Sequence, residues 1–400
     1  MNRYKLWVLT LGNFAVGTGS LVVAGILPEI AAGLGTSVAA AGQLVTVYGL
    51  ALALGAPLLG MAARRFERKA LMVGGLAIFV LACMLGVFAN NFTALIISRA
   101  LAGLGAALFT PNAAALAAQL VAPEHRGRAI ALVFAGFSIA SVIGMPLGTY
   151  IGCEFGWRVA FALVAALGFL ALLAIGKTLP SSAPVPAVAL RIWLRLFRQL
   201  TPMLAVAITV INMAGQYALF TYIAALLGEM HGIRPTGVSA LLVWFGVAGV
   251  LGNAFAGRVV DRVGASLFAT IGIGVLLIAM IIMASSGTSL PLTLVAMGLW
   301  GSAAFAISSA QQVRLVNHDP RLASATLALN TSALYVGQAL GALLGGIAIS
   351  VLGLHSVVWT GVVLLMTALC LSIWESFLSH NNKARHSELS PLTITRPRVR

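Results

Sequence analysis

The sequence predicts an all-α integral membrane protein with twelve transmembrane helices in two pseudo-symmetric six-helix bundles. The first observation is composition: of 400 residues, 60% are hydrophobic and 8% are charged, with a mean hydropathy of +1.03. A soluble chain could not cover so much apolar surface. The second is a series of apolar runs that reach the roughly 20 residues needed to cross a bilayer. The third is an internal repeat, in which Gly144-Met-Pro-Leu-Gly148 returns 197 positions later as Gly341-Ala-Leu-Leu-Gly345.

The apolar runs give the expected helices in order. The first six are Leu6–Ile30, Val38–Ala63, Ala70–Ala89, Thr93–Ala118, Gly127–Gly152 and Arg158–Thr178. The second six are Thr201–Leu227, Gly237–Arg258, Ala265–Ser286, Leu290–Arg314, Ala323–Leu352 and Ser356–Leu378. The same offset also superposes Gly55, Gly60 and Arg65 on Gly252, Gly257 and Arg262. A duplicated membrane bundle is the architecture of a carrier, whose halves move about a site between them.

The basic residues indicate the topology. The net charge is +15, but alternating loops that begin inside at Met1 place 21 of the 24 Lys and Arg residues on the inside. Only Arg99, Arg158 and Arg234 fall elsewhere. The positive-inside rule therefore predicts that both termini are cytoplasmic. Because topology explains the excess of positive charge, we do not expect nucleic acid as a partner.

The expected organisation is an N-terminal bundle over residues 1–179, a linker over 180–200, a C-terminal bundle over 201–378 and a tail over 379–400. The linker begins with three prolines within seven residues and continues with Arg191, Arg195 and Arg198 on one helical face. Such a segment is expected to lie on the cytoplasmic membrane surface, although a plain connector is the alternative. The polar, basic tail is expected to be disordered.

Two loops at equivalent places in the repeat share a motif. The second copy reads Gly257-Arg-Val-Val-Asp261-Arg262-Val-Gly264, and the first runs from Gly60 through Arg64 and Arg65 to Glu67. Here the chain resembles the major facilitator superfamily, whose signature loop has a glycine, an acid, a basic residue and a second glycine in this order. The resemblance spans the whole chain and implies the major facilitator fold. The first copy departs from it, with Arg64 at the position of the acid and Glu67 at the second glycine.

The loop residues could act in gating. A glycine allows helix ends to approach closely, and an acid can accept hydrogen bonds from a helix N-terminus or pair with a base. Glu124 and Arg321 are also repeat partners of opposite charge, as are Arg64 and Asp261. The resulting hypothesis pairs Arg64 or Arg65 with Asp319, and Asp261 with Arg126 or Arg128. The alternative is that these charges only set the topology.

Arg99 is the candidate for proton coupling. It lies six residues into the fourth run, and a buried membrane arginine costs roughly 2.5–3.5 kcal/mol on insertion scales. In the family that the chain resembles, an arginine in this context belongs to a signature associated with proton coupling; the alternative is that Arg99 snorkels to the outer interface. Ser20 stands where many relatives in this branch have an acid. Glu29 is the remaining carboxylate near the outer end of helix 1, either as a proton site with Arg99 or as an interfacial group.

Small residues recur at every fourth position of the fifth run: Gly136, Ala140, Gly144, Gly148, Gly152 and Gly156. They form one face on which another helix can pack very closely. The segment from Gly144 through Pro146 to Gly148 resembles the antiporter signature of the drug:proton antiporter branch, which implies export. Helix packing alone is a compatible interpretation.

Uncharged polar and aromatic residues are the substrate-binding candidates. In the fold that the resemblance implies, helices 1, 4, 7 and 10 face the cavity and supply Asn13, Asn112, Asn212, Gln216, Tyr217, Tyr222, Gln311 and Gln312. Helices 8 and 11 add Trp244, Asn330, Tyr335 and Gln338. Such groups suit a neutral or weakly charged, flat or amphipathic solute. For each residue, an interhelical hydrogen bond is the alternative. The stretches around Gln216, Gln311 and Asn330 are similar to those of bacterial purine base and nucleoside efflux pumps.

The expected function is export of a small organic solute across the bacterial inner membrane in exchange for protons, by a monomer. Hydrophobic drugs, purines or nucleosides, and sugars are the candidate solutes. The sequence contains no Gly-x-x-x-x-Gly-Lys-Ser/Thr loop for ATP, no His-Glu-x-x-His and no cluster of acids and histidines at membrane depth, so no cofactor or metal is expected. A membrane-embedded enzyme or receptor is the alternative of a different class; the lack of a catalytic constellation argues against the enzyme, and the lack of a sizeable extramembrane domain against the receptor.

Overall fold

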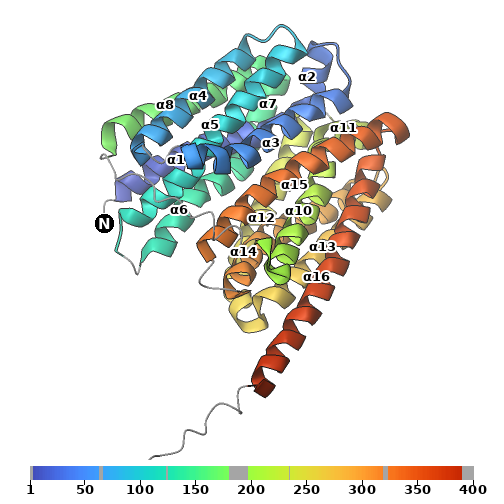
Figure 1. Cartoon of the computed structure of the whole chain (residues 1–400). Helices are drawn as coiled ribbons and strands as arrows, with labels where there is room; N and C mark the ends of the chain where they lie inside the picture. Colours follow the sequence, from blue (N-terminus) through green and yellow to red (C-terminus); the bar gives the residue numbers. More distant parts are fainter. Residues whose placement is uncertain are drawn as a thin grey trace, which may run out of the picture.

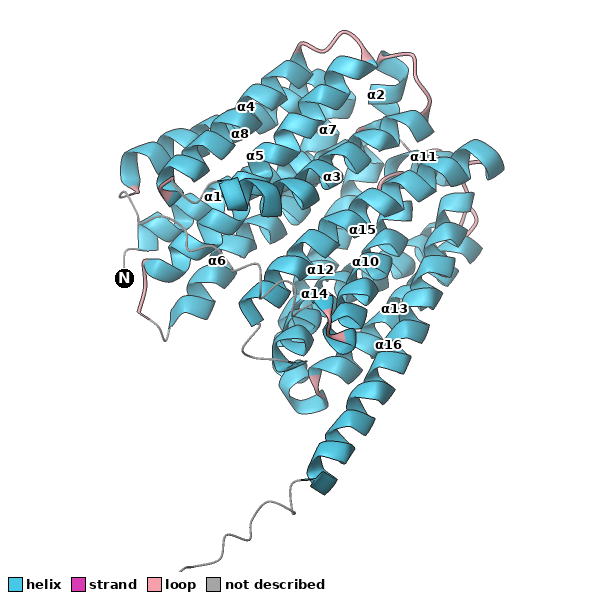
Figure 2. Cartoon of the chain, viewed as in Figure 1, coloured by secondary structure: helices cyan, strands magenta, loops and turns pink. Residues whose placement is uncertain are grey.

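The computed structural model of the chain describes residues 3–62, 66–122, 125–179, 197–233, 235–318 and 323–389. Twelve helices in these ranges are long and apolar enough to cross a membrane, which confirms the predicted spans. The described part contains helices and short loops but no strand (Figure 2). Most of the predicted linker lies outside the described residues, as do Arg64, Arg65, Asp319 and Arg321.

The first half contains α1 (Arg3–Gly25), α2 (Leu27–Gly33), α3 (Val38–Ala62), α4 (Arg68–Val87), α5 (Phe92–Gln119), α6 (Arg126–Ile139), α7 (Met145–Phe155) and α8 (Trp157–Thr178). The second contains α10 (Leu200–Phe220), α11 (Ile223–His231), α12 (Pro235–Val263), α13 (Ala265–Ser285), α14 (Leu290–His318), α15 (Ala323–Leu352) and α16 (Ser356–Leu389). Since α16 continues to Leu389, the start of the tail that was expected to be disordered is helical. A helix that is already nucleated extends at little cost through good helix formers such as Lys383, Ala384 and Arg385.

The first predicted span is broken near its end. Pro28 has no backbone N–H to donate and its ring clashes with the preceding turn, so α1 ends at Gly25 and the short α2 begins after Ile26. The repeat reproduces this break between α10 and α11 at Thr221 and Tyr222, where the sequence has no proline. There the Tyr222 hydroxyl donates a 2.7 Å hydrogen bond to the Ala342 carbonyl oxygen.

The repeat is visible in the backbone as well as in the sequence. Gly156 and Gly353, which are 197 positions apart, both have positive φ (94° and 87°) where one helix ends and the next begins. Gly264 also has a positive φ of 89°. Its repeat partner Glu67 has φ −66°, an ordinary value for any residue. The first loop therefore departs from the motif at a place where its backbone does not require glycine.

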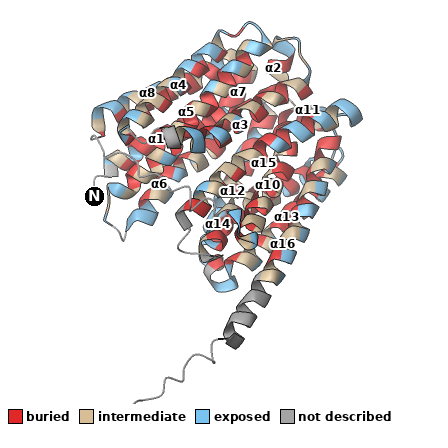
Figure 3. Ribbon diagram, viewed as in Figure 1, coloured by how far each residue is buried: buried red, intermediate tan, exposed pale blue. Residues whose placement is uncertain are grey.

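The two halves form two bundles that lie side by side, blue to green and yellow to red in Figure 1. They meet along α3 with α15 and along α12 with α7. Buried residues fill each bundle and the contact between them, whereas exposed residues cover the outside (Figure 3). Many of the exposed residues are large and apolar, for example Leu81 at 69% and Leu352 at 76% exposure. This apolar exterior suits lipid, since a soluble monomer rarely exposes large apolar patches.

Candidate functional site

The small-residue face of the fifth span packs against α1. A Cβ atom at Gly144, Gly148 or Gly152 would clash with Thr18 or Val22 of α1 or with Ile26 just after it, three residues that follow each other at four-residue intervals. Gly136 extends the face to the Thr10 carbonyl oxygen. Gly156 does not belong to it, because a Cβ there would meet nothing within 4 Å and the residue ends the helix instead. The second half repeats the arrangement, with Gly337, Gly341 and Gly345 against the backbone of α10.

A π-helical turn over Ala140–Gly144 interrupts the fifth span between α6 and α7. Pro146 follows it near the first turn of α7, and a wider turn accommodates the backbone bond that a proline cannot make. The same turn contacts the other bundle. A Cβ atom at Gly246 of α12 would lie 2.7 Å from the Ser141 carbonyl oxygen and 2.9 Å from the Val142 Cα. The antiporter-like segment thus adjoins a close backbone contact between the two bundles.

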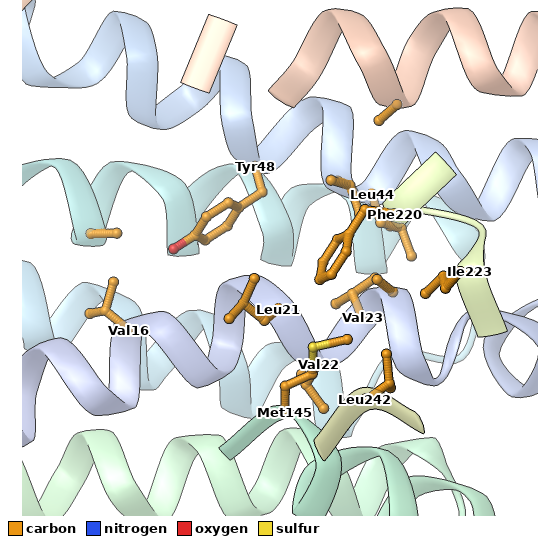
Figure 4. Packing of buried hydrophobic residues seen from close by; sticks show 14 of the residues in the cluster. Val16, Leu21, Val22, Val23, Leu44, Tyr48, Met145, Phe220, Ile223 and Leu242 are labelled. Carbon is orange, nitrogen blue, oxygen red and sulfur yellow. The ribbon is translucent and has the colours of Figure 1, made fainter. Parts of the chain in front are cut away.

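The bundles also meet around α2 and α11, a region called here the α2/α11 end. Figure 4 shows Phe220, Ile223 and Leu242 of the second bundle near Val23 of α1 and Met145 of α7, and all are buried in one hydrophobic cluster. Beside this packing lies a cavity of about 320 Å³ with walls from both bundles. Its lining includes Pro28, Glu29 and Cys153 on one side, and Ala224, Glu229 and Val238 on the other.

Three of the predicted binding residues come together in the second bundle. Asn212, Gln311 and Asn330 line a small pocket with Thr209, and all four side chains are buried. Thr209 donates a 2.7 Å hydrogen bond to the Asn330 amide oxygen, and Gln311 donates one of 2.7 Å to the Ala205 carbonyl oxygen. The amide oxygen of Asn212 has no partner. The pocket volume is about 10 Å³, which is room for one water rather than for a solute.

Gln216 belongs to a second polar position, next to an aromatic cluster. Its amide oxygen accepts a 3.3 Å hydrogen bond from the Trp300 indole, and its amide nitrogen is buried without a partner. Trp300 lies edge-on to Phe220 and Phe245, with ring centroids 5.9 and 5.0 Å away. Tyr217 packs edge-on against Phe220 at 5.3 Å. Sequence reasoning missed Trp300, Phe220 and Phe245, because a buried aromatic inside an apolar run gives no polar signal.

Several other candidates make the interhelical or local contacts that were the alternative. Asn13 donates to the Val133 carbonyl oxygen and accepts from Thr110, which links α1 to α6 and α5. Asn112 donates to Leu108 of its own helix. Tyr222 is fully buried in its bond to Ala342.

Three further candidates stand apart from the polar pocket. Tyr335 is half-buried beside the bundle contact, where its carbonyl oxygen lies near Gly49. Gln338 is buried, and its amide nitrogen has no partner. Gln312 is exposed and does not line the pocket formed by Gln311.

The structure places Trp244 apart from the polar pocket of the second bundle. The side chain is 42% exposed and lies on the same stripe of α12 as the exposed Leu251 and Phe255. Its indole donates a 2.8 Å hydrogen bond to the Leu294 carbonyl oxygen of α14. Trp244 therefore sits on the outer surface of the bundle, at a place that helical periodicity would have excluded if the buried face of α12 had been known.

Arg99 does not snorkel, since only 1% of it is exposed. Its guanidinium carbon lies 4.4 Å from the centroid of the Tyr48 ring and 6.0 Å from that of Phe161. Its Nε and Nη2 atoms are buried without a hydrogen-bond partner. A desolvated cation–π contact contributes about 2 kcal/mol, whereas burying an ion costs several kcal/mol. The aromatic rings alone do not compensate the buried charge.

Of the two alternatives for Glu29, the proton pair with Arg99 is not formed: no ion pair joins them in the described part of the chain. Glu29 is half-buried in α2 and accepts a 3.2 Å hydrogen bond from the Cys153 thiol, and its second carboxylate oxygen is buried without a partner. Ser20, on the other hand, is buried in α1. Glu29 is nine residues further along, on the order of 13 Å of helix, so the break at Pro28 carries it toward the cavity.

The loop motif is only partly described. Arg126, Arg128 and Arg262 are exposed, and the side chains of Gly60 to Arg65, Asp261 and Asp319 lie outside the described residues. The proposed charge pairs therefore stay predictions. Among the described residues, a Cβ atom at Gly257 would meet nothing within 4 Å, so the close helix approach expected there is not seen. Gly264 is needed for its positive φ rather than for packing.

A buried ion pair was missed. Sequence analysis counted Arg314 among the inside residues that set the topology, but it lies within α14 and pairs with Glu375 of α16, both almost fully buried. Arg314 also donates a 3.0 Å hydrogen bond to the Ser372 hydroxyl. The signal was Glu375 itself, an acid inside an apolar run, where an ionisable residue should have a partner.

Fold and site together describe a membrane transporter built from two pseudo-symmetric bundles. The family model described as Major Facilitator Superfamily matches residues 9–223 and 205–397, and the chain belongs to this family. It is 31% identical to the MFS-type transporter YbcL of Bacillus subtilis over 93% of this chain and 95% of that one. It is also 31% identical to a chloramphenicol resistance protein of Streptomyces lividans, over 84% and 87%. A bacterial homologue of the human lysosomal transporter Spinster has the same fold (TM-score 0.77, 18% identity, 94% and 98% coverage).

Proposed function

We propose that the protein exports a small organic solute across the bacterial cytoplasmic membrane by proton-coupled alternating access. The observation that carries this proposal is the close contact of Gly246 with the π-helical turn at Ser141 and Val142, beside the antiporter-like segment. Export is favoured by the similarity to a chloramphenicol resistance protein. One chain supplies both bundles, so a monomer suffices for transport.

The packing supports motion of the bundles as units. Within the first bundle, the glycine face of α6 and α7 locks onto α1; within the second, α15 locks onto α10 in the same way. Between the bundles, Gly246 packs against the backbone of Ser141 and Val142, and it has no side chain that would interlock with the other bundle. The glycine faces hold each bundle together. The two bundles can then separate at the α2/α11 end and expose the cavity. With both termini cytoplasmic, the α2/α11 end faces outward.

The aromatic cluster around Trp300 and Gln216 suits a neutral, flat solute. It combines rings from α10, α12 and α14 with one amide whose nitrogen is unsatisfied. Binding sites for such solutes are mainly apolar, with few polar groups that fix orientation. The proton carrier is proposed to be Glu29, which has one buried unpartnered oxygen and lines the cavity at the α2/α11 end.

Transport in proteoliposomes under an imposed pH gradient tests the proposal. We expect flux of chloramphenicol, or of a nucleoside or sugar in the same panel, to follow the gradient and to collapse when a protonophore removes it. Trp300→Phe removes the indole donor to Gln216 and should raise the half-saturating concentration about tenfold, from the loss of one hydrogen bond and one ring. Trp244→Phe on the outer surface is the matched control and should leave it unchanged.

Two outcomes would contradict the proposal. If no solute in the panel responds to the pH gradient, proton-coupled transport of these classes is wrong. If Glu29→Gln transports with the same dependence on the gradient as the unmodified protein, Glu29 does not carry the proton, and the carrier lies elsewhere.

A further inference from the structure

Three buried polar side chains meet in the first bundle, and the arginine among them is not satisfied by the other two. Arg99 of α5, Tyr48 of α3 and Ser20 of α1 are exposed by 1%, 0% and 4%. Arg99 Nε and Nη2 have no hydrogen-bond partner, and the Tyr48 and Ser20 hydroxyls have none except each other. Buried polar groups are nearly always paired, and a cluster of unpaired donors around a cation calls for an acceptor.

No carboxylate of the described residues supplies that acceptor. Three of the described acids have partners other than Arg99: Glu29 accepts from Cys153, Glu229 lies 3.5 Å from His355, and Glu375 pairs with Arg314. Glu67 and Glu154 are exposed at helix ends. Arg99 thus keeps a full positive charge in an apolar bundle, held only over the faces of Tyr48 and Phe161.

The cluster adjoins the contact between the bundles. Tyr48 lies near Arg99, Ser20 and Cys83 in its own bundle and near Tyr335 of α15, which belongs to the other bundle. The neighbouring Gly49 packs against the Tyr335 carbonyl oxygen, where a Cβ atom would lie 3.0 Å away. In Figure 4 the Tyr48 side chain extends from α3 toward α1, with its hydroxyl between Val16 and Leu21 in this view. An anion at this place would neutralise Arg99 and link α1, α3 and α5 beside the contact between α3 and α15.

We propose that Arg99, Tyr48 and Ser20 form a binding site for a small monovalent anion, either a free halide or the carboxylate group of a solute. One guanidinium balances one negative charge, so a divalent anion would stay uncompensated. The N–H groups of the guanidinium and the two hydroxyls supply directed donors, and charge-assisted hydrogen bonds of this kind are the strong ones. The inference stands apart from proton coupling, because it concerns occupancy of the site and not transport.

Thermal unfolding of the purified full-length protein tests the site directly. The protein is titrated with chloride, bromide, acetate or benzoate against sulfate at constant ionic strength, because the site is not expected to take a divalent anion. We expect the apparent Tm to rise with chloride or with a carboxylate, in step with the logarithm of its concentration once the site begins to fill. A response to halides alone assigns a free inorganic anion, and a response to carboxylates with competition by chloride assigns the solute group.

Matched variants separate a specific site from a general salt effect. Arg99→Gln should abolish the rise, and Tyr48→Phe, which keeps the ring and removes the hydroxyl, should weaken apparent affinity about tenfold. Arg158→Gln removes an arginine that stacks on Trp157 and already donates to the Ala89 carbonyl oxygen, so the rise should persist. The proposal is overturned if the unmodified protein shows no anion-dependent rise, or if Tyr48→Phe responds with unchanged affinity. Tyr48→Phe decides the matter even if Arg99→Gln does not fold.

Discussion

The buried ion pair between Arg314 and Glu375 should matter far more to stability than the exposed pair between His355 and Glu229. Glu375→Gln keeps the shape of the side chain and removes its charge, so the buried Arg314 guanidinium retains only neutral acceptors, the Ser372 oxygens and the new amide oxygen. Removing one member of a buried pair costs about 3–5 kcal/mol, because the remaining charge loses compensation. At about 2–4 °C per kcal/mol, the expected fall in Tm is roughly 6–20 °C, toward the lower end for a chain of this size.

The control is Glu229→Gln. Its side chain is 56% exposed and that of His355 is 62% exposed, so water screens the pair. An exposed pair contributes about 0–1 kcal/mol, and the expected change in Tm is under about 4 °C. The double variant Arg314→Met with Glu375→Gln removes the uncompensated charge and should recover part of the loss, as hydrophobic replacement of buried pairs often does.

Fluorescence-detected thermal unfolding of the three variants in detergent ranks them. We expect the unmodified protein and the Glu229→Gln variant to be the most stable and similar to each other. The double variant should be less stable, and Glu375→Gln the least stable. If Glu375→Gln unfolds within the range of Glu229→Gln, the reasoning from burial and charge is wrong. If the double variant is no more stable than Glu375→Gln, the loss does not come from an uncompensated guanidinium.

Two predictions concern glycine contacts. Gly144→Ala places a methyl group against Thr18 and should cost about 1–3 kcal/mol by overpacking, reduced by the roughly 1 kcal/mol that alanine gains over glycine in a helix. Gly274→Ala, where a Cβ meets no described atom within 4 Å, should be neutral or stabilising. Equal Tm values for the two variants would contradict the packing. Gly246→Val should disfavour closure of the α2/α11 end, since its side chain would overlap the turn at Ser141. Cys153, which lines the cavity there, should then react faster with a membrane-impermeant maleimide, and an unchanged rate would show that this contact does not hold the end closed.

The sequence predicts helices better than it predicts which side chains contact each other. It found the twelve spans, and it found the glycine face of the fifth span without knowing that α1 covers it. It also found Asn212, Gln311 and Asn330, which do meet in one pocket. It grouped Trp244 with these residues, because a single tryptophan in an apolar helix has no local feature that tells lipid from interior. It left a Glu29–Arg99 pair open from their shared nearness to the outer end, although contact depends on the rotation of each helix and not on depth alone.

The missed groups show the same limit. Arg314 looked like a loop residue because it follows an apolar run, and only the extension of α14 to His318 brings it inside the bundle. Trp300, Phe220 and Phe245 are ordinary apolar residues in sequence, and their cluster exists because three helices converge on it.

What the sequence determined by itself is local and repetitive: the length and number of the spans, the break at Pro28, the glycine seams, the turns at Gly156 and Gly353, and the duplication that relates them. These follow from hydropathy and backbone sterics, which act within one turn of the chain. Only the tertiary structure decided which bundle face each polar side chain meets, and whether a buried charge is compensated, as for Arg314, or not, as for Arg99. Such pairing joins residues far apart in sequence, and its energy depends on the orientation and burial of both partners at once.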